Sequence, residues 1–157
     1  MSALTAAMPL TIYYDASCPL CRKEMHTLRE HDRREQLRLV DCSAPDFRDP
    51  EVERAGFQVP QLMTLIHARD AEGRWFIGVD VFVLAYRAVG IDAIAGLWSN
   101  RVLRPFWDWV YPWIARHRML LSRIGFTTAF GWLVEWLARR AQARSQACND
   151  QVCERPD

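Results

Sequence analysis

Two cysteines separated by two residues stand near the N-terminus, in the stretch YYDASCPLCRKEM (13–25). Thiols at this spacing can form a redox-active disulfide, supply half of a metal site, or lie in a core without doing chemistry. A helix that begins at Pro19 would place Cys18 at its N-cap and Cys21 in its first turn. The free N–H groups and the positive end of such a helix favour a thiolate at Cys18. The local sequence therefore predicts a redox pair.

The spacing also assigns a role to each thiol. Positions i and i+3 at a helix start bring two Cα atoms within the roughly 4.4–6.8 Å that a disulfide needs. We expect Cys18 to be the exposed attacking nucleophile, and Cys21, one step inward, to be the resolving thiol. The predicted reaction is dithiol–disulfide exchange with a protein or small-molecule disulfide or dithiol. This reaction needs a separate electron donor but no bound cofactor, so we expect no cofactor.

The surrounding residues predict the elements that hold this pair. Runs of β-forming residues indicate strands, and an apolar stripe with polar residues opposite indicates each helix. The order β-α-β-α-β-β-α, with a late hairpin, is that of a thioredoxin-like sheet. We therefore expect an α/β fold, a thioredoxin-like mixed sheet flanked by helices, with a helical C-terminal extension. The expected strands are 10–14, 37–42, 61–68 and 74–78, and the expected helices are 19–34, 50–55 and 79–90.

Two residues near the expected strand ends are further candidates for the site. Asp15 lies three residues before Cys18, where its carboxylate could accept a proton from Cys21 or bond local N–H groups in an Asx turn. Val59-Pro60 stands just before the expected third strand, where thioredoxin-like folds usually carry a cis-proline packed against the cysteines. Pro60 is therefore the candidate for a cis-proline that contacts substrate, although an ordinary turn proline fits the sequence too.

The chain divides by composition at about residue 100. It has 157 residues, enough for one compact domain with a real core, and the part after residue 100 carries five of its seven tryptophans. We expect a thioredoxin-like domain over 1–100, a helical extension packed on it over 101–146, and a polar tail over 147–157.

Overall composition excludes several classes of protein. Half of the residues are hydrophobic, a quarter are charged and the net charge is +1, which is ordinary for a globular chain. No nucleic-acid-binding module is recognisable in the sequence. We see no export signal and no run long enough to cross a membrane. We therefore expect a cytoplasmic protein. In the cytoplasm, paired cysteines take part in chemistry or bind metal more often than they stabilise a fold as a disulfide.

Three stretches of the sequence resemble a known family. YYDASCPLC is similar to its Asp-Gly-x-Cys-x-x-Cys signature, and MTLIHARDAEGRWFIGVDVF (63–82) to its Met-opened strand, hairpin and Gly-x-(Asp/Glu)-Ala-Phe helix start. YPWIARHR (111–118) is similar to its late Tyr-x-Trp-x-Ala-x-x-Arg block. The chain thus resembles, over roughly residues 10–118, the DCC-type thiol-disulfide oxidoreductase-like proteins, a thioredoxin-like family long catalogued as a domain of unknown function.

The resemblance implies that Asp15, Cys18 and Cys21 form the redox site. Neither cysteine is among the departures from the family pattern, so the site assignment is kept. The departures are Ala16 in place of glycine, Val81 in place of alanine and His117 in place of asparagine.

Metal binding is the main alternative for the cysteines. Cys18 and Cys21 together with Cys148 and Cys153 would give four thiolates, a usual ligand set for zinc or an iron–sulfur cluster. The second pair has looser spacing and lies in the polar tail. It could instead exchange electrons with the first pair, or have no role, which we favour. Cys42, which follows a strand, is expected to be a small buried hydrophobe.

A different class of function would use the Trp- and Arg-rich C-terminal third. Two apolar helical stripes favour packing on the sheet domain, and aromatic side chains left exposed would form a docking patch for a partner or a membrane surface. The stripes are Leu103, Phe106, Val110 and Ile114, and Phe126, Phe130, Leu133 and Leu137.

Overall fold

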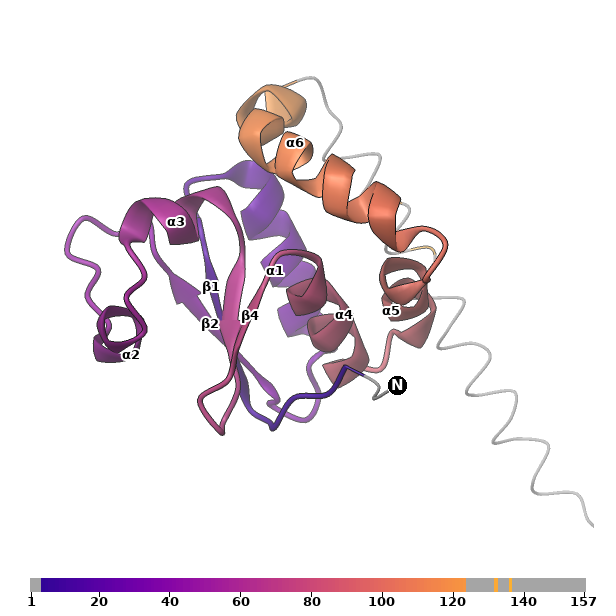
Figure 1. The fold of residues 1–157 in the computed structure, drawn as a ribbon, viewed down its shortest axis with the longest axis horizontal. Helices are drawn as coiled ribbons and strands as arrows, with labels where there is room; N and C mark the ends of the chain where they lie inside the picture. The colour runs from indigo at the N-terminus through magenta and orange to yellow at the C-terminus, as the bar shows by residue number, and fades with distance from the viewer. Residues whose placement is uncertain (1–3, 124–131, 133–135, 137–157) are drawn as a thin grey trace, which may run out of the picture.

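The computed structural model describes residues 4–123 together with Trp132 and Trp136. Within these residues one sheet has four strands in the order β2-β1-β3-β4 (Figure 1). β1 (Leu10–Tyr14) pairs in parallel with β2 (Leu37–Asp41) and antiparallel with β3 (His67–Arg69). β3 pairs antiparallel with β4 (Trp75–Ile77). The mixed sheet confirms the expected α/β, thioredoxin-like fold.

Helices cover both faces of this sheet. α1, α4 and α5 pack in one hydrophobic cluster on one face, whereas α2 and α3 contribute to a smaller cluster on the other. α6 lies across α1, α4 and α5 (Figure 1). The helices of the described residues are α1 (Pro19–His31), α2 (Pro50–Arg54), α3 (Val59–Thr64), α4 (Val79–Ala88), α5 (Asp92–Ser99) and α6 (Arg104–Arg123).

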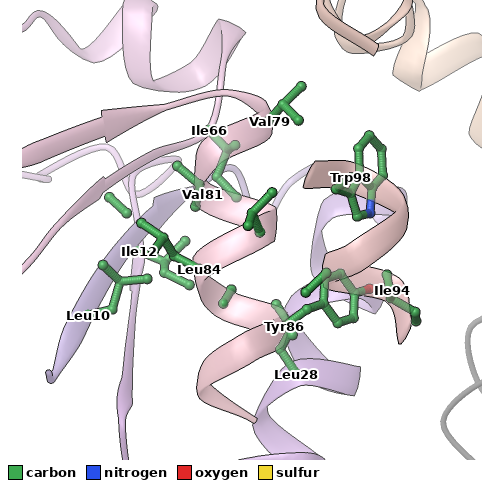
Figure 2. Close-up of a cluster of buried hydrophobic side chains, with 14 of the residues drawn as sticks. Leu10, Ile12, Leu28, Ile66, Val79, Val81, Leu84, Tyr86, Ile94 and Trp98 are labelled. Carbon is green, nitrogen blue, oxygen red and sulfur yellow. The ribbon is translucent and has the colours of Figure 1, made fainter. Parts of the chain in front are cut away.

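β1 separates the two clusters, because successive side chains of a strand point to opposite faces. Leu10 and Ile12 are fully buried in the larger cluster, where they face Leu84 of α4 (Figure 2). Tyr13 points the other way and packs with Leu62 of α3. Since both faces of β1 are buried, its register is fixed, and so is the place where the loop after β1 begins.

The expected third strand is wrong in its first half. The chain forms α3 over Val59–Thr64, and β3 begins only at His67. The Gln58 N–H donates to Gln61 Oε1 at 2.8 Å, and Pro60 lies in the first turn, where its fixed φ suits a helix. These helix-start signals outweigh the β-forming character of the apolar residues that follow.

α1 is three residues shorter than expected, because Asp32 turns the chain toward β2. The helix ends at His31 rather than Arg34. The Asp32 carboxylate accepts the backbone N–H of Gln36 at 2.9 Å and that of Leu37 at 2.8 Å. These bonds replace the last helical turn and connect α1 directly to the first residue of β2.

α5 has no counterpart among the expected elements. α4 ends at Ala88, two residues before Gly90, which has a φ of +76°, and α5 begins two residues after that glycine, at Asp92. Trp98 of α5 stacks on Phe82 of α4 with ring centroids 5.3 Å apart. α5 thereby supplies part of the surface on which α6 packs.

α6 packs through a stripe that only partly matches the expected one, since Ile114 faces inward but Phe106 does not. Phe106 is 50 % exposed, whereas Trp107 and Tyr111 pack against the core. Two hydrogen bonds fix this rotation of the helix. Trp107 Nε1 donates to the Leu97 carbonyl at 3.1 Å, and the Tyr111 hydroxyl accepts the Ile66 N–H at 3.1 Å.

The division of the chain into 1–100, 101–146 and 147–157 stays a prediction. α6 falls in the expected extension and contacts the helices of the sheet domain. The second expected stripe and the tail lie outside the described residues. In the part of the chain that the structure describes, no helix is long and apolar enough to cross a membrane.

Candidate redox site

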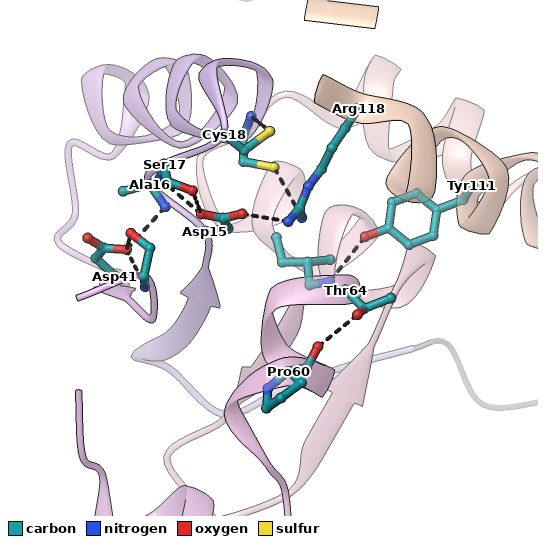
Figure 3. Close-up of polar contacts among 12 residues, drawn as sticks. Asp15, Ala16, Ser17, Cys18, Asp41, Pro60, Thr64, Tyr111 and Arg118 are labelled. Atoms are coloured by element: carbon teal, nitrogen blue, oxygen red, sulfur yellow. Dashed lines mark hydrogen bonds and ion pairs between the residues drawn. The ribbon is translucent and has the colours of Figure 1, made fainter. Parts of the chain in front are cut away.

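The loop after β1 is held by carboxylates from two neighbouring strand ends. Asp15 Oδ1 accepts the Ser17 N–H at 2.9 Å and the Ser17 hydroxyl at 2.5 Å, which is an Asx turn. The Ala16 N–H donates to Asp41 Oδ1 at 3.1 Å, which ties the loop to β2 (Figure 3). The Asx-turn role considered for Asp15 is therefore present, and its role as a proton acceptor stays a prediction.

Cys18 is the N-cap residue of α1. Its backbone is extended, and its Sγ accepts the Cys21 N–H at 3.4 Å. Both thiols are free, as is the thiol of Cys42. This is the first-turn geometry that the position of Pro19 predicts, since proline at the start of α1 loses no helical hydrogen bond.

The two thiols have opposite acidities. The hydrogen bond that the Cys21 thiol donates to Cys18 lowers the pKa of Cys18 to about 6, although burial opposes this shift. The backbone N–H of Cys21, the charge of Arg118 and the N–H of Leu20 lower it further. The same hydrogen bond, together with burial, raises the pKa of Cys21. The pair is therefore poised as a Cys18 thiolate beside a Cys21 thiol.

The expected exposure of the two cysteines is wrong. Cys18 is 0 % exposed, and Cys21 is half-buried. The N-cap hydrogen bond directs Cys18 Sγ back toward the first turn of α1. Cys21, one turn along the helix, faces the cavity described below.

Arg118 of α6 completes the surroundings of the pair. Its Nη2 lies 2.5 Å from Asp15 Oδ2, and its Nη1 lies 3.9 Å from Cys21 Sγ (Figure 3). The Asp15 side chain is 3 % exposed and that of Arg118 is 16 % exposed, so this ion pair is largely shielded from water. The sequence expectations gave Arg118 no role, although it is the arginine of the third family-like block.

Tyr111, from the same block, fixes α6 over the start of β3. Its hydroxyl accepts the Ile66 N–H, and its ring lies against Gly78, where an added Cβ would come 3.4 Å from Tyr111 Cε1. Gly78 has a φ of +69° and belongs to the second block. The three family-like blocks, far apart in sequence, thus meet around one site.

Pro60 does not have the predicted position. The Val59–Pro60 bond is trans, and the cis peptide bond among the described residues is Met8–Pro9. Pro60 is exposed in the first turn of α3, and its carbonyl accepts the Thr64 hydroxyl at 2.7 Å (Figure 3). The cis-proline candidate is therefore wrong, because the chain forms a helix where the expected strand would have placed the proline beside the cysteines.

A cavity of about 290 Å³ lies next to the pair. Its wall includes Cys21, Asp15 and Arg118 on one side, and most of the remaining wall is aromatic or aliphatic. The apolar side chains come from α1 and from the segment α3 to α6, and they include Leu20, Met25, Leu62, Ile66, Phe82, Trp98, Trp107 and Ile114.

Glu24 is a second acidic group on this wall. It follows Cys21 by three residues on α1, and its carboxylate accepts the hydroxyl of the buried Tyr86. Burial raises the pKa of Glu24, and burial together with the Glu24 charge raises that of Tyr86. The i, i+3 spacing from Cys21 could have predicted that Glu24 lies on the same face of α1 as that cysteine. No local feature of the sequence predicts its hydrogen bond to Tyr86 of α4.

The metal alternative is not tested by this arrangement. The described residues hold no group of three or more metal-ligating side chains, and Cys148 and Cys153 lie outside them. Cys42 is buried as expected, and burial raises its pKa to about 12, which leaves its thiol protonated.

A thioredoxin-like sheet with a free Cys-x-x-Cys pair at the start of α1 defines the class of thiol–disulfide oxidoreductase-like proteins. Comparison with known families narrows this class. The family model of the DCC1-like thiol-disulfide oxidoreductases matches residues 12–124, and the chain belongs to this family.

A curated relative gives no finer assignment. The chain is 29 % identical over 114 residues to an uncharacterised chloroplastic protein of Arabidopsis thaliana. The match covers 72 % of this chain and 52 % of the relative, so the chain spans about half the length of that protein. No solved structure matches the chain significantly.

Proposed function

We propose that the protein is a thiol–disulfide oxidoreductase in which Cys18 is the nucleophile and Cys21 the resolving thiol. The observation that carries this proposal is the hydrogen-bonded pair itself. The Cys18 sulfur accepts the Cys21 N–H at the N-terminus of α1, where the thiolate is stabilised, while Cys21 keeps its proton.

The reaction proceeds in two exchanges. The Cys18 thiolate attacks one sulfur of a substrate disulfide R–S–S–R, the S–S bond breaks, and the first thiolate leaves and takes up a proton. Cys21 then loses its proton and attacks Cys18 in the mixed disulfide, which releases the second thiol. Two electrons pass from the pair to the substrate, and a separate dithiol donor must return them before the next turnover.

The burial of Cys18 adds one requirement to this scheme. Because Cys18 is 0 % exposed, a substrate sulfur can reach it only after neighbouring side chains move. Asp15 has a positioning role in the proposal, since its two carboxylate oxygens hold the loop before Cys18 and the guanidinium of Arg118.

The first experiment is a redox titration of the purified protein. The protein is equilibrated in glutathione buffers across a range of potentials, free thiols are counted by mass, and metal is assayed on the same sample. We expect a reversible two-electron change confined to Cys18 and Cys21. Stoichiometric zinc or iron with unreactive thiols would replace the proposal with the metal alternative.

Turnover by single-cysteine variants tests the roles of the two thiols. Cys18→Ser should abolish reductase turnover, and Cys21→Ser should accumulate a mixed disulfide at Cys18. Cys42→Ser is the matched control, because Cys42 is a buried thiol outside the pair. Retained turnover in Cys18→Ser would contradict the proposal.

The exposed aromatic face of α6 supports a second candidate function, the docking of a redox partner. Trp109 is 72 % exposed and Trp113 is 51 % exposed, although α6 packs on the domain through other side chains. If this face binds a protein substrate or the electron donor, Trp109→Ser should raise the KM for that partner and leave the reduction of a small disulfide unchanged.

The compartment remains a prediction. The cytoplasmic location expected from the sequence would keep the pair reduced, and the Arabidopsis relative is described as chloroplastic. Measuring the redox state of the pair in the native cell would show in which direction it works.

A further inference from the structure

The cavity beside the pair gives access to one of the two thiols. Cys21 lies in its wall, whereas Cys18 is 0 % exposed behind the N-cap hydrogen bond. A molecule that fills the cavity therefore meets the sulfur of Cys21 first. In the scheme for a disulfide substrate, by contrast, Cys18 forms the first bond.

The size and lining of the cavity suit a small apolar group. Its volume of about 290 Å³ is roughly twice that of the ~150 Å³ engineered cavity that holds benzene. Four aromatic rings, each in contact with the next and with neighbouring centroids 4.6 to 5.6 Å apart, form much of its wall. These rings belong to Phe82, Trp98, Trp107 and Tyr111.

Each charged group of the wall already has a polar partner. Arg118 is bound to Asp15 at 2.5 Å, and the carboxylate of Glu24 accepts the Tyr86 hydroxyl. A charged ligand would have to displace one of these contacts in a place that water reaches poorly. The cavity therefore favours an uncharged group.

We propose that the cavity binds the uncharged aromatic or aliphatic group of a small thiol, and that this thiol reduces the oxidised pair by attacking the Cys21 sulfur. The proposal rests on the proposed exchange function of the pair. It assigns the missing electron donor to a chemical class, apolar low-molecular-weight thiols, and places the mixed disulfide on Cys21.

The steps balance with two molecules of thiol. The thiolate R–S⁻ forms a bond to Cys21 Sγ, the Cys18–Cys21 bond breaks, and its electron pair leaves on Cys18. A second R–S⁻ attacks the outer sulfur of the mixed disulfide, which releases R–S–S–R and leaves Cys21 to take up a proton. Two thiols are oxidised, and the pair gains two electrons. Cys18 is suited to leave, because the N-cap hydrogen bond stabilises its thiolate.

The test forms the mixed disulfide on one cysteine at a time. Cys18→Ser leaves Cys21 as the single thiol of the pair, and Cys21→Ser leaves Cys18. Each variant is treated with benzyl methanethiosulfonate or with 2-hydroxyethyl methanethiosulfonate, which share one leaving group and differ in the group delivered. The rate of modification at each cysteine is followed by peptide mass mapping. The rate with the benzyl reagent is divided by the rate with the hydroxyethyl reagent. This ratio is then divided by the same ratio measured for free 2-mercaptoethanol, which corrects for the intrinsic reactivity of the two reagents.

We expect the corrected ratio at Cys21 to be about tenfold or more, because a buried phenyl group gains apolar contacts that a hydroxymethyl group does not. At Cys18 the ratio should be close to one. Equal ratios at both cysteines, or a preference at Cys18 alone, would overturn the proposal.

Two tryptophan variants of α6 separate the cavity from general surface effects. In the Cys18→Ser background, Ile114→Trp fills the cavity wall and should bring the ratio at Cys21 close to one. Leu120→Trp adds a similar side chain at a position that is 59 % exposed on the same helix, and should leave the ratio unchanged. A preference that survives Ile114→Trp in a folded protein would show that the cavity does not hold the benzyl group.

A competition measurement gives a result even if Ile114→Trp does not fold. Excess toluene, which cannot react with a thiol, should slow modification of Cys21 by the hydroxyethyl reagent and leave that of Cys18 unchanged. Absence of protection at Cys21 would overturn the proposal. Neither measurement requires turnover, so the cavity proposal and the proposed function can fail separately. The modification and competition results can be negative while Cys18→Ser still abolishes reductase activity, and they can be positive if Cys18→Ser retains it.

Discussion

The guanidinium of Arg118 lies 2.5 Å from the carboxylate of Asp15, although 103 residues separate the two in the chain. This ion pair joins α6 to the loop that follows β1, and Arg118 also lies 3.9 Å from Cys21 Sγ. α6 therefore contributes a charge to the surroundings of the cysteine pair, in addition to packing on the domain.

Arg118→Met should both destabilise the protein and raise the pKa of Cys18. The variant leaves the buried Asp15 carboxylate without its cation, and removing one partner of such a pair costs about 3 kcal/mol. The charge that lowers the pKa of Cys18 is lost at the same time. Arg116→Met, at an exposed position of the same helix, is the control. Urea unfolding and thiolate absorbance against pH measure the two effects, and equal behaviour of both variants would contradict the assignment.

The titration of Cys18 provides a second prediction. In the reduced protein, the ultraviolet absorbance of a thiolate should appear with a midpoint near the pKa of about 6 and be missing in Cys18→Ser. In Cys21→Ala, which removes the donor, the midpoint should rise, because the hydrogen bond from the Cys21 thiol is the largest cause of the lowered pKa. In the wild-type protein, a midpoint near the ordinary pKa of cysteine, about 8.5, would contradict the N-cap argument.

Glu24→Gln should stabilise the protein at neutral and higher pH. Burial raises the pKa of Glu24 in the folded protein, so folding favours the protonated form. The resulting stability is fully present below the pKa of the unfolded chain and is lost as the pH rises through the raised pKa. Glutamine cannot ionise and avoids this loss. Urea unfolding at pH 5 and 8 tests the prediction, with Glu53→Gln on the exposed face of α2 as the control.

Two glycine-to-alanine variants test the backbone conformation at the start of α4. Gly78 and Gly56 both have a positive φ, +69° and +76°, so alanine is strained at either position. An alanine Cβ at 78 would also meet the Tyr111 ring at 3.4 Å, whereas at 56 it would meet nothing within 4 Å. We expect Gly78→Ala to lose about 1 kcal/mol more than Gly56→Ala in thermal or urea unfolding, because the ψ of −129° at Gly78 lies outside the left-handed helical region, whereas Gly56 follows the end of α2, where that region is common. Equal losses would show that the backbone at residue 78 relaxes freely.

The elements that local residues specify were predictable from the sequence. β1 is a run of β-forming residues at the expected positions, and Pro19 fixes the start of α1, so the N-cap place of Cys18 follows from a few neighbours. α3 was missed because the capping bond between Gln58 and Gln61 competes with β-forming side chains, and a single sequence does not decide which prevails.

The site was predictable only where it is local. The cysteine spacing identifies the pair, but its burial depends on where Cys18 Sγ turns and on what covers it. The contacts of Arg118 and Tyr111 depend on the rotation of α6, which the hydrogen bonds of Trp107 and Tyr111 to other elements determine. Such contacts between distant segments leave no periodic signal in the sequence.

The position of α6 also bears on how the protein can be shortened. The composition of the chain suggests a cut near residue 100, which would look harmless because every strand of the described sheet precedes it. Such a cut would remove Arg118, the cation at the redox pair, and Tyr111, whose hydroxyl accepts the N–H just before β3. It would also remove the part of the cavity wall that Trp107 and Ile114 form. A fragment that ends there would keep both cysteines and lose the environment that makes them different from each other, so a useful fragment must include α6 at least as far as Arg118.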